Sequence, residues 1–162
     1  MVLRSSELAL RANWALLALL AAACTSASAG SGADAASLVS CEHDPRIAVY
    51  TAGIEAKSPD GSVHIRLLAS DPSPPARGTN TWTIRILGSD GKDLTGATID
   101  VKPFMPDHGH GPSALPVASA NADGSWSVAN LDLFMPGVWR VTFTVHGPSG
   151  DRDVVFFFCI EG

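Results

Sequence analysis

The sequence predicts an antiparallel β-sandwich of seven to eight short strands, because three features recur from residue 38 onward. Apolar and polar residues alternate with a period of two, which indicates strands with one buried face. Segments dense in Gly, Pro, Asp and Asn separate these runs. No apolar pattern repeats with the period of a helix. Many short strands divided by such turns are typical of a sandwich that is immunoglobulin-like in outline.

The individual strands follow from the alternation in chain order. In residues 81–87, for example, Trp82, Ile84 and Ile86 alternate with polar residues. Residues 154–160 (VVFFFCI) are apolar on both faces, as expected for a central strand. The alternation and the turns together predict strands at residues 46–51, 62–69, 81–87, 97–104, 114–119, 126–131, 138–145 and 153–160.

The N-terminal residues predict export from the cytoplasm. Arg4 and Arg11 precede a short apolar stretch that ends at Cys24, and a transmembrane helix needs about 20 apolar residues. A basic start, a short apolar core and small residues describe a secretory signal. Leu-Ala-Ala-Ala before Cys24 is similar to a bacterial lipobox, in which the cysteine is lipidated. We therefore expect residues 1–23 to be a lipoprotein signal peptide; the alternative is ordinary cleavage beyond Cys24.

The remaining chain divides into a tether and one domain. Residues 24–37 hold the lipidated cysteine and a low-complexity stretch of small residues, typical of a flexible tether. Residues 38–162 are long enough for a single hydrophobic core. The formal net charge of −5 argues against a nucleic acid partner. We expect a lipoprotein anchored in a membrane of the bacterial cell envelope, facing the periplasm or the exterior.

Two cysteines remain for the domain, one near each of its ends. Cys41 and Cys159 would meet an oxidising compartment after export, so a disulfide between them is the default expectation. Closure of so long a loop stabilises a fold by about 4–5 kcal/mol in the chain-entropy model.

Histidine and methionine gather in two loops that share a Phe-Met-Pro triplet. One is FMPDHGHGP at residues 104–112, and the other is LFMPG at residues 133–137. Because consecutive strands reverse direction, the predicted strand order brings both loops to the same end of the sandwich, whereas His64 and His146 fall at the opposite end. The candidate metal ligands at the first end are Met105, His108, His110, Met135 and His43.

Imidazole and thioether together favour copper, because soft sulfur selects Cu(I) and imidazole binds either oxidation state. Gly109 and Gly111 allow a tight turn that directs both loop histidines towards one ion. Asp107 is placed to accept a hydrogen bond from a ligand histidine. In the alternative interpretation the loop is an ordinary exposed turn, Met135 fills a gap in the core, and the same loops dock an envelope protein. The sequence contains no hydrolase elbow, phosphate loop or dinucleotide fingerprint, so we do not expect an enzyme.

The stretch from residue 88 to residue 111, which ends in Met-Pro-Asp-His-Gly-His-Gly, resembles the YtkA-like and FixH-like domains of bacterial envelope proteins. Their usual loop is close to Met-Pro-x-Met-Gly-His-Gly. The resemblance implies an extracytoplasmic β-sandwich, associated in FixH proteins with assembly of copper-dependent oxidases, and copper-carrying envelope sandwiches use similar Met/His sets. Met105 and His110 match the family's methionine and histidine. His108 stands where the family more often has methionine, which replaces a soft ligand by a borderline one.

Overall fold

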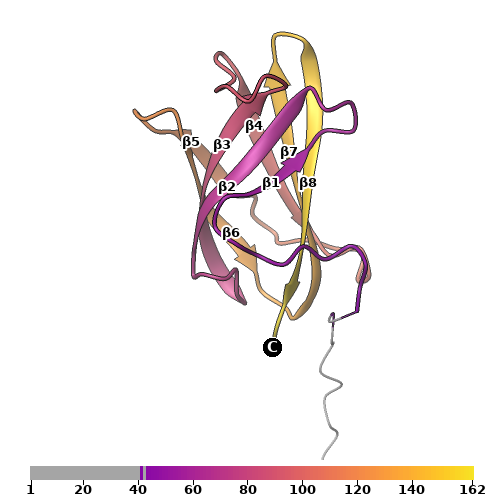
Figure 1. Cartoon of the computed structure of the whole chain (residues 1–162). Helices are drawn as coiled ribbons and strands as arrows, with labels where there is room; N and C mark the ends of the chain where they lie inside the picture. Colours follow the sequence, from indigo (N-terminus) through magenta and orange to yellow (C-terminus); the bar gives the residue numbers. More distant parts are fainter. Residues whose placement is uncertain (1–40, 42) are drawn as a thin grey trace, which may run out of the picture. The chain divides into compact units, whose positions relative to one another are not determined.

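A computed structural model of the chain describes Cys41 and residues 43–162, which form eight antiparallel strands in two sheets (Figure 1). The prediction of an all-β sandwich is therefore confirmed. The predicted signal peptide, the predicted lipidation site Cys24 and the tether lie outside the described residues. Within the described part of the chain, no helix is long and apolar enough to cross a membrane.

The two sheets differ in size, and neighbouring strands in both are antiparallel. The larger sheet has the order β1-β2-β3-β6-β5, and the smaller has the order β4-β7-β8. The strands are β1 (Ile54–Lys57), β2 (Val63–Asp71), β3 (Gly78–Gly88), β4 (Thr98–Phe104), β5 (Val117–Ala120), β6 (Trp126–Leu133), β7 (Gly137–Gly147) and β8 (Gly150–Ile160).

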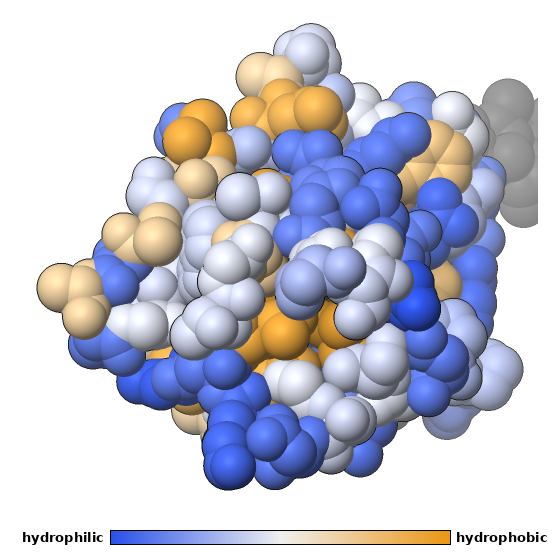
Figure 2. All heavy atoms as spheres, turned by 90° about the horizontal axis from the view of Figure 1, so that it is seen from above, coloured by the Kyte–Doolittle hydropathy of each residue, from blue (hydrophilic) through white to orange (hydrophobic). Residues whose placement is uncertain are grey.

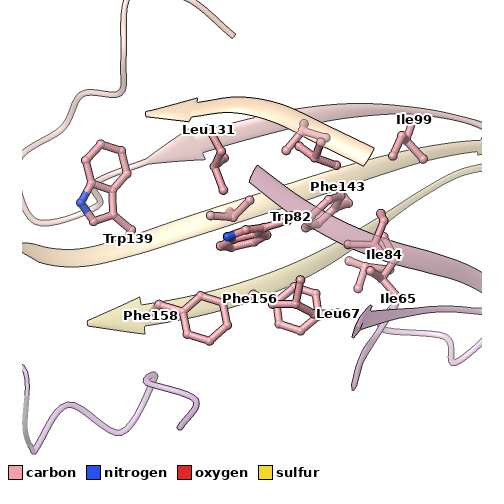
Figure 3. Packing of buried hydrophobic residues seen from close by; sticks show 14 of the residues in the cluster. Ile65, Leu67, Trp82, Ile84, Ile99, Leu131, Trp139, Phe143, Phe156 and Phe158 are labelled. Carbon is pink, nitrogen blue, oxygen red and sulfur yellow. The ribbon is translucent and has the colours of Figure 1, made fainter. Parts of the chain in front are cut away.

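The hydrophobic core fills the space between the sheets, because each long strand turns alternate apolar side chains inward. Trp82 of β3 is fully buried, stacks on Phe143 of β7 with ring centres 6.3 Å apart, and meets the edge of Phe158 of β8 at 5.5 Å. Figure 3 shows these aromatic rings side by side, with Trp139 further along towards one end of the core.

The structure corrects two expectations about the strands. Residues 46–51 form no strand; this segment crosses the edge of β8, where the Ala48 amide donates to the Phe157 carbonyl at 2.9 Å. Moreover, β8 lies at an edge of its sheet and is not central. Its second apolar face has a local cause, because Cys41 is bonded to Cys159 and the Arg46 guanidinium lies over the Phe157 ring.

Strand register defines the two ends of the sandwich. Phe104 pairs with Arg140 and Gly137 with Ile160, so the loop after β4 and the turn before β7 lie at one end, which we call the lower pole after its place in Figure 1. The two Phe-Met-Pro triplets therefore lie at the same end, as expected from the strand order. The turns after β1, β3, β5 and β7 form the upper pole, where hydrophilic residues lie among smaller apolar patches when it is seen from above (Figure 2).

Candidate metal site at the lower pole

The histidine loop, residues 104–112, closes on itself through backbone hydrogen bonds. The Met105 amide donates to the His110 carbonyl at 2.7 Å, and the His108 and Gly109 amides donate to the Met105 carbonyl at 3.2 and 2.9 Å. Gly109 has a φ of +73°, which glycine adopts without the penalty that other residues incur. A Cβ atom on Gly111 would lie 2.5 Å from the Pro103 carbonyl oxygen. The loop thus requires the glycines that the sequence provides.

Met105 and His110 face each other across an isolated antiparallel bridge. Directly opposed residues of an antiparallel pair direct their side chains to the same face. Met105 is fully buried, His110 is half-buried and His108 is exposed. The loop therefore places its potential ligands in a gradient from the hydrophobic core to solvent.

The imidazoles of His108 and His110 are close neighbours, with ring centres 5.7 Å apart and planes 73° apart. Two imidazoles on one ion, with metal–nitrogen bonds of about 2.0–2.1 Å as for zinc, have ring centres roughly 5–6 Å apart. No hydrogen bond or ion pair within residues 43–162 involves either ring. Their nitrogens are therefore available to a ligand, and the spacing is compatible with a shared one.

The second Phe-Met-Pro triplet meets the histidine loop through an aromatic contact. The Phe134 ring stacks on His110, with ring centres 5.7 Å apart and an interplanar angle of 23°. Phe134 also meets Trp139 edge-on at 5.4 Å, and the Trp139 indole N–H donates to the Met135 carbonyl at 2.9 Å. This chain of contacts orients the His110 ring. The Met135 side chain is half-buried against the hydrophobic core.

The segment after Cys41 reaches the same pole through the disulfide, which joins Cys41 to Cys159 with Cα atoms 5.5 Å apart, as the cysteine pattern predicted. His43 is exposed in the turn that the Asp44 amide closes by donating to the Cys41 carbonyl. Arg46 then binds the histidine loop, because its guanidinium forms an ion pair with Asp107 at 2.9 Å.

The interpretation of Asp107 as the partner of a ligand histidine is thus not supported, because its carboxylate is held by Arg46. Arg46 also binds Asp44, and its side-chain hydrogen bond, followed by its backbone N–H, lowers the pKa of Asp44 to about 2. The hydrogen bonds that Arg46 donates to Asp44 and then to Asp107 raise the pKa of Arg46. Sequence reasoning missed Arg46, which lies 61 positions from Asp107, and missed Phe134, although the repeated triplet contained it.

The donor set narrows the possible ions. Among the described residues, no group of three or more His, Cys, Asp or Glu side chains is arranged to hold a metal. A site based on the His108–His110 pair therefore needs a thioether or a ligand from another molecule. Met105 is the methionine whose backbone pairs with His110. Mixed imidazole and thioether ligands suit copper better than zinc, calcium or magnesium.

The other two histidines lie at the upper pole, as the strand order predicts, and both have acidic partners. His64 lies 3.1 Å from Glu55. His146 lies between Asp151 at 2.9 Å and Asp100 at 3.1 Å. Hydrogen bonds to Asp151 and then to Asp100 raise the pKa of His146.

Comparison with solved structures finds remote likenesses. A copper-bound variant of FetP from uropathogenic Escherichia coli strain F11 is 16% identical, with a TM-score of 0.45, and the match covers 68% of this chain and 96% of that one. The as-isolated FetP of the same strain is also 16% identical, with a TM-score of 0.45, and the match covers 70% of this chain and 97% of that one. A copper-bound variant of Campylobacter jejuni P19 is 13% identical, with a TM-score of 0.41, and the match covers 67% of this chain and 97% of that one. At these identities the likeness concerns the fold alone.

No curated protein matches the chain in sequence. The YtkA-like family model, however, matches residues 58–144, which extend from the end of β1 to β7 and include the whole histidine loop. This match spans more than half of the 162 residues. The chain therefore belongs to the YtkA-like family.

Proposed function

We propose that this protein binds copper through the histidine loop and acts as a copper carrier or buffer in the bacterial cell envelope. The observation that carries the proposal is the pair of imidazoles, His108 and His110, whose ring centres lie 5.7 Å apart and whose nitrogens have no partner within residues 43–162. Met105, opposite His110 in the loop, supplies a candidate thioether. Met135 and His43 are further candidate ligands at the same pole.

The position of the ligands favours a site that exchanges its ion. His108 is exposed and Met105 is buried, so an ion held between them would keep one side open to another protein or chelator. A closed structural site surrounds its metal with four protein ligands, which is a different arrangement. An open site with few ligands suits transfer or buffering of the ion.

The envelope location is part of the same proposal. The Cys41–Cys159 disulfide is typical of a protein that works outside the reducing cytoplasm. The N-terminal sequence adds the expectation of a lipid anchor at Cys24. Mass spectrometry of the mature N-terminal peptide tests this anchor, since a diacylated or triacylated cysteine is heavier than a free one.

Titration of the full chain with Cu(I) and with Cu(II), each in competition with a chelator of known affinity, tests the proposal. We expect the His108→Ala/His110→Ala variant to bind copper more than about 100-fold more weakly than the wild type. Loss of a residue that only hydrogen-bonds a metal ligand lowers metal affinity about 10–100-fold, and loss of two ligands should cost more. The matched control is His64→Ala/His146→Ala, which removes two histidines at the upper pole. Equal affinity in the wild type and the loop variant would refute copper binding by this pair.

A second candidate function is docking of an envelope protein at the lower pole without a metal. The observation that favours it is a groove of about 410 Å³ beside the crossing segment, with a largely apolar lining that includes Ile47, Tyr50, Pro74, Pro75 and Phe158. The proline-rich loop 71–77 forms one wall of this groove. A copper titration that shows no binding, for either oxidation state, would leave this candidate as the better one.

A further inference from the structure

A row of aromatic and cationic side chains crosses the outer face of the smaller sheet at its lower end. Strand register places Phe104 of β4, Arg140 of β7 and Phe157 of β8 side by side across the three strands. The Arg140 guanidinium carbon lies 5.1 Å from the centre of the Phe104 ring, within the range of a cation–π contact. Lys102, two residues before Phe104 on the same face of β4, is exposed.

Arg140 differs from every other arginine in the described residues, because it alone has no acceptor for its charge. Its Nε atom is buried and has no hydrogen-bond partner, which is unfavourable for a charged donor. The others bind an oxygen each: Arg46 binds Asp107, Arg66 binds Glu55, Arg77 binds the Phe134 carbonyl, Arg85 binds Asp93 and Arg152 binds Asp60.

The acidic residues of the same sheet face lie away from Arg140. Asp100 and Asp153 are register partners of Thr144, four residues along β7 towards the upper pole. They are also engaged there, since Asp100 binds His146 and Asp153 accepts a hydrogen bond from the Thr144 hydroxyl at 2.7 Å. At the lower pole, Arg46 lies over Phe157 and its charge is balanced by Asp44 and Asp107. The positive charges that no acidic residue pairs on this face are therefore those of Arg140 and Lys102, on a protein whose net charge is −5.

We propose that the Arg140 patch, consisting of Lys102, Phe104 and Arg140, docks a segment of a partner protein that carries Asp or Glu carboxylates. The buried Nε and the Phe104 ring hold the guanidinium in place, so its two terminal nitrogens are presented to a carboxylate end-on. Arginine flanked by aromatic rings is the composition enriched at the energetic centres of protein interfaces. Charge complementarity selects an acidic segment as the occupant.

This inference does not rest on copper binding, but the two sites are adjacent. Phe104 immediately precedes Met105, so a partner on the Arg140 patch would lie beside the histidine loop. Docking that needs no metal gives an acidic partner a defined position next to the candidate ligands.

The test is a titration of the ¹⁵N-labelled full chain, without copper, with a hexaglutamate peptide, followed by the Arg140 Nε–H signal and the backbone amides of β4, β7 and β8. We expect saturable shifts confined to the lower ends of these strands, and none with a hexaglutamine peptide. We expect Arg140→Gln to weaken binding at least about tenfold, as for loss of a charge-assisted bidentate pair. Arg66→Gln, which removes an exposed arginine of the larger sheet, is the matched control and should bind as the wild type does.

Four results would overturn the proposal. Equal binding of hexaglutamine, or unchanged affinity in Arg140→Gln, would remove the charge as the cause. Equal shifts with acetate at the same carboxylate concentration would indicate a site for small anions instead. Self-association that rises with concentration and disappears in Arg140→Gln would identify a second copy of this chain as the occupant.

If circular dichroism shows that Arg140→Gln does not fold, a second variant and a measurement on the wild type still test the proposal. Arg140→Lys keeps the charge and loses the planar fork, so we expect an intermediate affinity. Binding to the wild type should also weaken as salt rises, because the contact is between exposed charges. Salt-independent binding in the wild type counts against the proposal regardless of any variant.

Discussion

At the upper pole His146 lies between two carboxylates, whereas at the lower pole His108 and His110 have aromatic neighbours and each other. The upper imidazole stands on a strand, where cross-strand neighbours supply its partners. The lower pair stands on a loop closed by backbone hydrogen bonds. The difference shows how one residue type serves structure in one place and remains available to a ligand in another.

The largest effect that separates the poles should come from the disulfide. Replacing Cys41 and Cys159 by serine should lower the free energy of unfolding by about 2–5 kcal/mol, measured by chemical denaturation. Because the bond holds residues 43–50 at the lower pole, hydrogen exchange should rise there more than at the upper pole. An equal rise in exchange at both poles would contradict a local role for this bond.

A smaller loss of stability should follow from Gly111→Ala. The new Cβ atom would lie 2.5 Å from the Pro103 carbonyl, so the backbone of the histidine loop must shift, at a cost of about 1–3 kcal/mol. Gly147→Ala at the upper pole is the matched control, because its Cβ would make ordinary contacts at 3.7 Å or more. Thermal melts of the two variants compare them directly, and equal melting temperatures would contradict the tight approach at Gly111.

Replacement of Met105 by leucine should separate ligation from packing. The swap conserves volume and should change stability by less than about 1.5 kcal/mol. If the sulfur binds copper, Cu(I) affinity should fall about tenfold, or ~1.4 kcal/mol, and Cu(II) affinity should fall less. Met135→Leu tests the other candidate thioether at the same pole in the same way. Unchanged Cu(I) affinity in both variants would restrict the site to imidazole ligands.

The smallest effect should be the pH dependence at the upper pole. Because its acidic partners raise the pKa of His146 above the ordinary value of 6.5, its protonated form stabilises the fold fully below that value. This contribution is lost as pH rises through the pKa of the folded protein. The wild type should therefore melt at a slightly higher temperature than His146→Gln below pH 6.5, and this difference should disappear as the pH rises through the raised pKa of His146. NMR titration should show a higher pKa for His146 than for an unfolded peptide, and a lower one would contradict the carboxylate contacts.

Most of the fold was predictable because alternation and turn chemistry are local signals. The strand order placed both Phe-Met-Pro triplets at one pole, and the expected disulfide followed from the oxidising compartment. The prediction of a strand at residues 46–51 was wrong, because this segment contacts the edge of β8 through the Ala48 amide and forms no strand of its own. Contacts such as Arg46 with Asp107 depend on where that segment runs, so spacing in the sequence carried no signal for them.

The position of β8 has a consequence for how the domain must begin. An eleven-residue edge strand with apolar side chains on both faces is a template for adding strands from other molecules, and hence for aggregation. Three residues before β1 hold that edge: Cys41 through a covalent bond, Ala48 through a backbone hydrogen bond and Arg46 through a guanidinium over Phe157. The stretch that carries them therefore acts as a protective cover for the sheet, and a shortened protein that starts at Ile54 should be poorly soluble even though every strand is present.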